Sequence, residues 1–309
     1  MSTTAYVFPG QGSQAPGMGQ KLAQEFPIAA DTFAEADAIL GFPLSQLCFA
    51  GPGPELTETR NAQPAILVTS VATLRVLQAE RSDLPLPGCV AGHSLGEYSA
   101  LVAAGALAFG DAVRLTRARG ELMARAGAQQ PGSMGAIVKL TDEQVTAICA
   151  EAAAATGEVV QVANYNSPGQ VVISGSQAGV AAAGERARAL GGRLMPLAVS
   201  IAAHSALMAS AAADFAAQVE ATTLVTPTIP IYGNVHAEPL TSVVAIRTEL
   251  VAQLTSPVHW TQTVRNMAAA GAQRMVEVGP GTVLTGLVRR IDGTLATANV
   301  AEPANLASL

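Results

Sequence analysis

Residues 92–96, with the sequence GHSLG, constrain the fold more than any other segment of the chain. The run 86–91 before them is short and apolar, as in a buried strand, and residues 97–107 after them follow a helical pattern. A serine flanked by glycines at two-residue spacing, between a strand and a helix, is typical of the nucleophile elbow. Such a helix directs its N-terminal N–H groups at a developing oxyanion. We therefore expect Ser94 to be a nucleophile on an α/β scaffold.

The alternation of strand, turn and helix continues outside this segment. A strand at 5–8 runs into a glycine-rich turn at 9–14, helical patterns follow to residue 47, and a longer helix is predicted at 61–77. Such alternation indicates an α/β architecture with a mostly parallel sheet. The other elements predicted in this part are helices at 111–126 (with Asp111 as N-cap), 205–221, 246–253 and 261–270, strands at 229–233 and 274–278, and a loose tail at 301–309.

The middle of the chain follows a different order. A strand at 135–140 precedes a helix that begins around residues 141–144 and ends near 155. The remaining predicted elements are strands at 158–163 and 170–174, joined by a turn at 164–169, then a helix at 177–190 and a strand at 193–199. The order βαββαβ is the ferredoxin-like pattern. We therefore expect a small ferredoxin-like subdomain at 132–200, inserted into a large α/β-hydrolase-like subdomain formed by 1–131 and 201–309.

Composition excludes several classes of function. The 309 residues carry a net charge of −6 and no run rich in Lys or Arg, so no nucleic-acid partner is expected. The most apolar stretch, 100–109, is too short to cross a bilayer, and the N-terminus lacks the pattern of a signal peptide. The three cysteines, Cys48, Cys89 and Cys149, are scattered, which favours a cytoplasmic protein without disulfides or a metal site.

A serine nucleophile needs a base, and the chain has only four histidines. His93 adjoins the serine on the turn, where neighbouring side chains usually point apart. His204 follows a predicted strand and a bend of small residues, where an α/β site places catalytic groups. His236 and His259 lie in segments where a histidine is more often solvated or structural. The sequence therefore favours His204 as the base.

The loop Gly10-Gln11-Gly12-Ser13 directly follows the first predicted strand. Backbone N–H groups of such loops bind anions, and an oxyanion donor is one interpretation. The loop lacks the Gly-Lys-Ser/Thr ending of a phosphate-binding P-loop. A plain tight turn remains the other interpretation.

Four motifs occur together in a fixed order along the chain. They are FPGQGSQ at 8–14, GHSLGEYSA at 92–100, NYNSPGQVVISG at 164–175 and EVGPG at 277–281. Together they resemble the malonyl-CoA:acyl carrier protein transacylase family, and the resemblance covers about residues 6–291. Because the joint occurrence is far more specific than any single motif, it implies roles for individual residues.

The resemblance first implies the catalytic groups. Ser94 matches the serine that is acylated, and His204 matches the base, which in this family is oriented by backbone carbonyls rather than by an aspartate. Gln11 and Leu95 match the residues whose backbone N–H groups form the oxyanion hole. No triad acid is therefore expected.

The resemblance also implies how the substrate is held. Arg119 matches the arginine that grips the malonyl carboxylate, which a guanidinium fork does in a bidentate manner. Taken alone, an arginine on a helix with Arg114 and Arg117 is usually solvated. Gln253 matches a glutamine that lines the site. Ala203 departs from the pattern, because relatives often carry a larger or polar residue before the base, a position that influences acyl selection.

The implied reaction is a ping-pong transfer of a malonyl group from malonyl-CoA, through an ester on Ser94, to the phosphopantetheine thiol of acyl carrier protein. It supplies fatty-acid elongation and uses no cofactor. Three alternatives remain open. The first is a discrete acyltransferase of a polyketide pathway. The second is a serine thioesterase or esterase, although no histidine follows His259, where such hydrolases usually carry their base. The third is a non-catalytic scaffold that binds a carrier protein.

Overall fold

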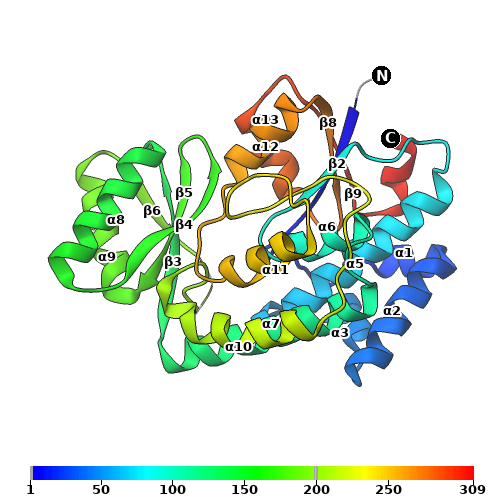
Figure 1. Cartoon of the computed structure of the whole chain (residues 1–309), viewed down its shortest axis with the longest axis horizontal. Coiled ribbons are helices and arrows are strands. Elements are labelled where there is room, and N and C mark those ends of the chain that lie inside the picture. Colours follow the sequence, from blue (N-terminus) through cyan, green and yellow to red (C-terminus); the bar gives the residue numbers. More distant parts are fainter. Residues whose placement is uncertain (1–2, 198, 200) are drawn as a thin grey trace.

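The computed structural model describes residues 3–197, 199 and 201–309, which form two separate sheets (Figure 1). The larger sheet has five strands in the order β7-β2-β1-β8-β9, and every neighbouring pair is parallel. Parallel neighbours require crossover connections, as the alternation of strands and helices predicts. The strands are β1 (Thr3–Phe8), β2 (Cys89–Gly92), β7 (Ile231–Tyr232), β8 (Ala272–Val278) and β9 (Ala296–Val300).

Helices cover both faces of this sheet, so its central strands are apolar on both sides. On β1, Tyr6 and Phe8 belong to one hydrophobic core, while Ala5 and Val7 belong to a second core on the opposite face. The first core is shared with α5, α7 and α10, and the second with α12 and α13. The helices of this part are α1 (Gln20–Glu25), α2 (Pro27–Leu40), α3 (Leu44–Ala50), α4 (Gly53–Thr57), α5 (Thr59–Glu80), α6 (Gly96–Ala103), α7 (Phe109–Gln129), α10 (Ala209–Ala221), α11 (Val243–Ala252), α12 (Trp260–Ala269) and α13 (Val283–Ile291), with short 3₁₀ turns η1 (Ala206–Met208) and η2 (Pro303–Ser308).

The smaller sheet is antiparallel and has the order β4-β5-β3-β6 (green, at the left of Figure 1). Its chain order β3-α8-β4-β5-α9-β6 is the predicted βαββαβ pattern. Helix α8 starts where the sequence predicts, with Thr141 as its N-cap in a capping box in which Gln144 is the reciprocal partner. The elements are β3 (Gly132–Val138), α8 (Asp142–Thr156), β4 (Val160–Ser167), β5 (Gln170–Ser176), α9 (Gln177–Ala189) and β6 (Arg193–Pro196).

A backbone contact joins the two parts beside the large sheet. The N–H of Val258 donates to the carbonyl of Ala163 on β4 at 2.8 Å, and the N–H of Tyr165 donates to the carbonyl of Val258 at 2.9 Å. These bonds attach the small sheet to the segment just before α12. The predicted division into 1–131 with 201–309 and 132–200 stays a prediction, since residues 198 and 200, near its second boundary, lie outside the described residues.

Several predicted elements differ from the observed ones. Asp111 lies in the first turn of α7 rather than at its N-cap, which is Ala108. The predicted strand at 86–91 begins only at Cys89, and Leu86 is exposed. The turn predicted at 164–169 is shorter, because β4 extends to Ser167 as a bulged edge strand.

The C-terminal segment was predicted as loose, and this is wrong for most of it. The 3₁₀ turn η2 contains the buried side chain of Leu306, whose carbonyl accepts a hydrogen bond from Arg81 at 2.8 Å. Helix α13 and strand β9 were also missed, although α13 is amphipathic, with Leu284, Leu287 and Val288 buried and two arginines in its last turn. None of the helices in the described part of the chain is long and apolar enough to cross a membrane.

Three glycines let the segment after β2 pack against the segment after β1. A Cβ atom on Gly92 would overlap the backbone of Gly96, and one on Gly96 would overlap the carbonyl of Phe8. A Cβ atom on Gly10 would overlap the carbonyl of His93. Gly10 and Gly96 are therefore required by backbone contact between the two loops, and Gly92 by backbone contact within its own turn.

We expect Gly96→Ala to destabilise the protein by about 3 kcal/mol or more, because the added methyl meets backbone rather than a movable side chain. Gly286→Ala is the matched control. No atom lies within 4 Å of its would-be Cβ in the interior of α13, so the change should stabilise by about 0.5–1 kcal/mol. Urea unfolding measures both; equal stability of Gly96→Ala and wild type would contradict the packing argument.

Candidate active site

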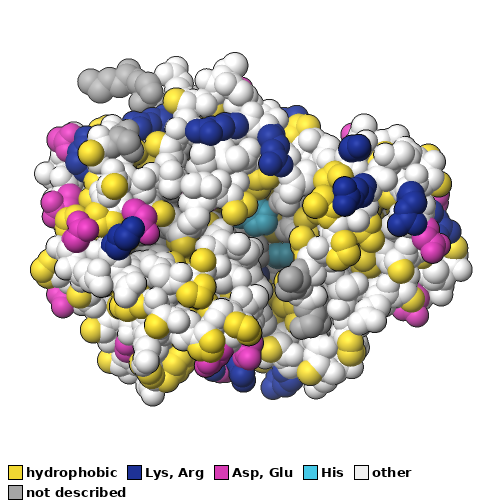
Figure 2. Space-filling view, turned by 180° about the vertical axis from the view of Figure 1, so that it is seen from behind, with side chains coloured by type: hydrophobic (Ala, Val, Ile, Leu, Met, Phe, Trp, Pro, Cys, Tyr) yellow, Lys and Arg dark blue, Asp and Glu magenta, His cyan; other side chains and the backbone are white. Residues whose placement is uncertain are grey.

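A cavity of about 280 Å³ lies between the two sheets, and Ser94 is on its wall. Figure 2 shows this hollow from outside, with histidine side chains at its floor. Both strands that lead into it end at the same edge of the large sheet, because Phe8 pairs with Gly92 in register. The loops that carry Gln11 and Ser94 therefore meet there, at the carboxyl ends of parallel strands. The small sheet supplies other parts of the wall, such as Met134 and Asn164.

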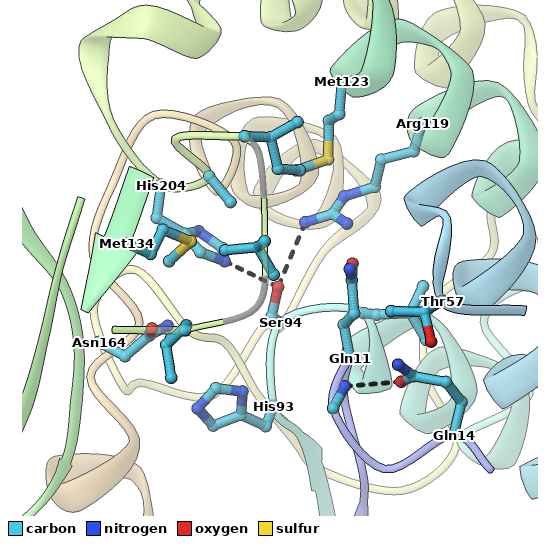
Figure 3. A pocket seen from close by; sticks show the side chains of 16 residues that line it. Gln11, Gln14, Thr57, His93, Ser94, Arg119, Met123, Met134, Asn164 and His204 are labelled. Carbon is cyan, nitrogen blue, oxygen red and sulfur yellow. Dashed lines mark hydrogen bonds between the residues drawn. The ribbon is translucent and has the colours of Figure 1, made fainter. Parts of the chain in front are cut away.

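Ser94 and His204 contact each other directly (Figure 3). Ser94 has a φ of 50°, the strained conformation of an elbow, and its Oγ lies 2.8 Å from Nε2 of His204. Nδ1 of His204 lies 2.7 Å from the backbone carbonyl oxygen of Gln253. A carbonyl oxygen only accepts, so Nδ1 carries the proton and Nε2 is free to accept the proton of the serine hydroxyl.

The surroundings of His204 keep its imidazole neutral. Burial, and next the positive charge of Arg119, lower the pKa of His204 from 6.5 to about 3. The carbonyl of Gln253 opposes this pKa shift, but as a neutral acceptor it is weaker than a carboxylate. A neutral imidazole bonded to a serine hydroxyl is the resting arrangement of a general base.

Arg119, from α7, is 2% exposed and points toward Ser94 (Figure 3). Its Nη1 donates to Gln63 Oε1 at 2.7 Å, and its Nη2 donates to Gln253 Oε1 at 2.8 Å and to Ser94 Oγ at 3.4 Å. Across the described residues, no carboxylate lies within ion-pair distance of this guanidinium. A buried cation held by neutral amides beside the serine is suited to a carboxylate on the ligand.

Gln11 and Leu95 lie on the same cavity wall as Ser94. Leu95 is the N-cap of α6, and Gln11 follows the Gly10 backbone contact with His93. The side chain of Gln11 accepts a hydrogen bond from Thr59 at 3.1 Å. Within the described ranges, the backbone N–H groups of Gln11 and Leu95 have no protein acceptor. They are thus available to an anion near Ser94.

The other three histidines are placed differently. His93 bonds Asn166 Oδ1 through Nε2 at 2.8 Å and packs edge-on against Trp260, so its ring points away from the base position, as expected. His259 stacks on Tyr165, and His236 does not line the cavity. Among the residues that the structure describes, no group of three or more His, Cys, Asp or Glu side chains is arranged to hold a metal ion.

Sequence reasoning missed two polar residues of the site. Asn234, two residues after β7, accepts the N–H of Ser94 through Oδ1 at 2.7 Å and donates to the carbonyl of Gly92 at 2.8 Å. Gln63, on α5, holds the guanidinium of Arg119. Neither residue belongs to a motif, and each is far along the chain from the residue it holds, Asn234 by 140 positions from Ser94 and Gln63 by 56 from Arg119. No local signal points to either.

Known proteins resemble this chain over its whole length. The family described as acyl transferase domain matches residues 5–307. The chain is 47% identical over 309 residues to the malonyl CoA-acyl carrier protein transacylase of Escherichia coli strain K12, covering 100% of this chain and 99% of that protein. It is 43% identical over 304 residues to the protein of the same name from Bacillus subtilis strain 168, covering 98% of this chain and 95% of that protein.

Solved structures agree in fold. The malonyl-CoA:acyl carrier protein transacylase of Xanthomonas oryzae superposes with a TM-score of 0.95 at 43% identity, covering 100% of this chain and 97% of that chain. A malonyl-transacylase solved in complex with its type II polyketide acyl carrier protein gives 0.96 at 45% identity, covering 99% and 98%.

The lowered pKa of His204 predicts how the reactivity of Ser94 depends on pH. A base must be neutral, so the rate of Ser94 sulfonylation by phenylmethylsulfonyl fluoride should stay level as the pH falls from about 7 to about 5. Arg119→Gln removes one cause of the lowered pKa, so the acidic decline should move to higher pH. Arg117→Gln, on the same helix, is the matched control. A wild-type decline centred near pH 6.5 would show that the environment does not lower the pKa of His204.

Proposed function

The chain belongs to the acyl transferase domain family and, within it, to the malonyl-CoA:acyl carrier protein transacylases, and we propose the residues by which it performs their reaction. It transfers a malonyl group from malonyl-CoA to the phosphopantetheine thiol of acyl carrier protein. One observation carries the assignment of residues: a serine hydroxyl contacts both a neutral imidazole and a buried guanidinium without a carboxylate partner.

In the first half-reaction, His204 Nε2 takes the hydroxyl proton as Ser94 Oγ forms a bond to the thioester carbon. The developing oxyanion accepts hydrogen bonds from the backbone N–H groups of Gln11 and Leu95. The carbon–sulfur bond then breaks, and CoA leaves as a thiol with the proton held by His204. The product is a malonyl ester on Ser94.

The second half-reaction reverses these roles. His204 takes the proton of the carrier protein's thiol, and the sulfur attacks the ester carbon through the same oxyanion site. The carbon–oxygen bond to Ser94 breaks, and His204 returns the proton to the hydroxyl. Two substrates use one serine in turn, which is ping-pong kinetics. Every group in this cycle is supplied by the chain itself, so we propose that it needs no cofactor.

Arg119 is assigned to the free carboxylate of the malonyl group. Gln253 and Gln63 hold two nitrogens of the guanidinium without neutralising its charge, and both are buried behind it rather than on the cavity wall. The carboxylate therefore finds a pre-oriented cation and forms charge-assisted hydrogen bonds. The ion pair also fixes the ester in one pose, which we propose disfavours attack by water.

We propose that the product supplies fatty-acid elongation. The polyketide alternative has one observation in its favour, because a similar solved transacylase was captured with a polyketide carrier protein. Competition between the two kinds of carrier protein for the malonyl-enzyme distinguishes them.

One observation disfavours the thioesterase alternative. The partner of His204 Nδ1 is a backbone carbonyl, whereas serine hydrolases usually have an acidic side chain in that place. A cytoplasmic location is proposed because Cys48, Cys89 and Cys149 are all free and buried.

Intact mass after brief incubation with malonyl-CoA tests the covalent step. We expect wild type to gain one malonyl group, Ser94→Ala to gain none, and added carrier protein to remove the group from wild type. CoA release without an adduct would instead indicate a thioesterase, and neither adduct nor release would refute the assigned chemistry.

Arg119→Gln should lower kcat/KM for malonyl-CoA by about 10- to 100-fold, the value of a charge-assisted hydrogen bond. Acylation by acetyl-CoA, which lacks the carboxylate, should not fall, and hydrolysis of any malonyl-enzyme should be faster. Rates of adduct formation with both thioesters measure this, with Arg117→Gln as control. Equal losses for malonyl-CoA and acetyl-CoA would mean that Arg119 does not recognise the carboxylate.

A further inference from the structure

Glu97 is a buried acid that the reaction above does not use. It lies in the first turn of α6, three residues after Ser94, and is 0% exposed. Its Oε2 accepts hydrogen bonds from Asn234 Nδ2 and, at 2.8 Å, from Gln253 Nε2. Its Oε1 has no partner among the described residues, and none of their cations lies within ion-pair distance of it. Burying a carboxyl group destabilises the folded state unless its oxygens are hydrogen-bonded, so a half-satisfied carboxyl group at this position calls for a functional explanation.

The amide of Asn234 has only one orientation that satisfies its neighbours. The backbone N–H of Ser94 can only donate, so Oδ1 must face it. Nδ2 then faces two acceptors, the carbonyl of Gly92 and Oε2 of Glu97. In this orientation Asn234 holds the strained turn at Ser94.

The amide of Gln253 is constrained in the same way. Arg119 can only donate, so Oε1 of Gln253 must face it. Nε2 then faces the carbonyl of Ser94 at 3.2 Å and Oε2 of Glu97. The backbone carbonyl of the same residue holds His204. Gln253 is therefore in contact with the nucleophile, the base and the guanidinium.

One oxygen atom, Oε2 of Glu97, touches both amides. We propose that Glu97 is a positioning residue of this active site, whose Oε2 keeps the amides of Asn234 and Gln253 oriented for Ser94, Arg119 and His204. Because it rests on the roles proposed above, its test must be separable from theirs.

Its role requires an acceptor atom at one position, not a negative charge. Burial, and next the nearby acid Glu249, raise the pKa of Glu97 well above its usual value, against the lowering effects of the hydrogen bond from Gln253 and of the charge of Arg119. Glu249 itself accepts the backbone N–H groups of Asn234 and Val235. An uncharged side chain of equal length at position 97 should therefore replace the carboxyl group.

Two conservative variants separate position from charge. Glu97→Gln keeps an acceptor oxygen at the same distance from the backbone, and should keep kcat/KM for malonyl-CoA within about threefold of wild type. Glu97→Asp keeps the carboxyl group but withdraws its oxygens by one methylene, and should lower kcat/KM for malonyl-CoA about tenfold or more. Glu97→Asp should also slow sulfonylation of Ser94, because Asn234 links Glu97 to the turn at Ser94. It should reduce the preference for malonyl-CoA over acetyl-CoA, because Gln253 links Glu97 to Arg119.

Glu277 is the matched control, since it is also 0% exposed and accepts hydrogen bonds from Leu284 and Thr285 at the start of α13. Glu277→Gln and Glu277→Asp should lower Tm without changing the malonyl-to-acetyl ratio. Three results would overturn the proposal: Glu97→Asp with wild-type rates and ratio, Glu97→Gln impaired as much as Glu97→Asp, or losses that only follow Tm as in the control pair.

Should Glu97→Asp fail to fold, Glu97→Gln decides alone. Wild-type-like rates with an unchanged ratio support the proposal, and a loss of about tenfold or more overturns it. Malonylation of wild type and Ser94→Ala is measured in the same series. A wild type that forms no adduct refutes the proposed function, whereas a normal wild type beside an unaffected Glu97→Asp refutes only the positioning role.

Discussion

The hydrogen bond from His204 Nδ1 to the backbone carbonyl of Gln253 determines the chemistry of this site. It fixes the tautomer, so that Nε2 faces Ser94 Oγ with a lone pair rather than a proton. A carbonyl does this without bringing a second negative charge into the cavity that we propose binds the malonyl carboxylate. A triad aspartate in the same place would repel that carboxylate and compete for Arg119.

The electrostatics of the cavity are organised around one buried cation. Amide oxygens of Gln63 and Gln253 accept hydrogen bonds from Arg119, and no carboxylate of the described chain lies within ion-pair distance of it. The same charge lowers the pKa of His204, so a carboxylate bound to Arg119 offsets part of that effect. In the binding mode we propose for Arg119, a carboxylated acyl group thus strengthens the base that acts on it, whereas an acyl group without a carboxylate does not.

The architecture brings these groups together from distant parts of the chain. Strands β1, β2 and β7 are parallel neighbours, so the loops that carry Gln11, Ser94 and Asn234 lie at one edge of the large sheet. The small sheet lies beside this edge (Figure 1), attached by the backbone contact of β4 with Val258. Its residues Met134 and Asn164 form part of the cavity wall (Figure 3). The site is therefore a junction of two sheets.

The amino-acid sequence by itself determined the elements whose signals are local. The elbow at Ser94 depends on glycines that backbone contact requires, and the capping box at Thr141 and the βαββαβ order follow from short patterns. It also indicated Ser94, His204 and Arg119, the last only through resemblance. Only the tertiary structure decided that Arg119 is buried, that Asn234 and Gln63 belong to the site, and that Glu97 joins two of its amides. The reason is physical: these contacts link side chains far apart in sequence, and nothing in the local periodicity of either partner records which atoms folding brings within hydrogen-bond distance.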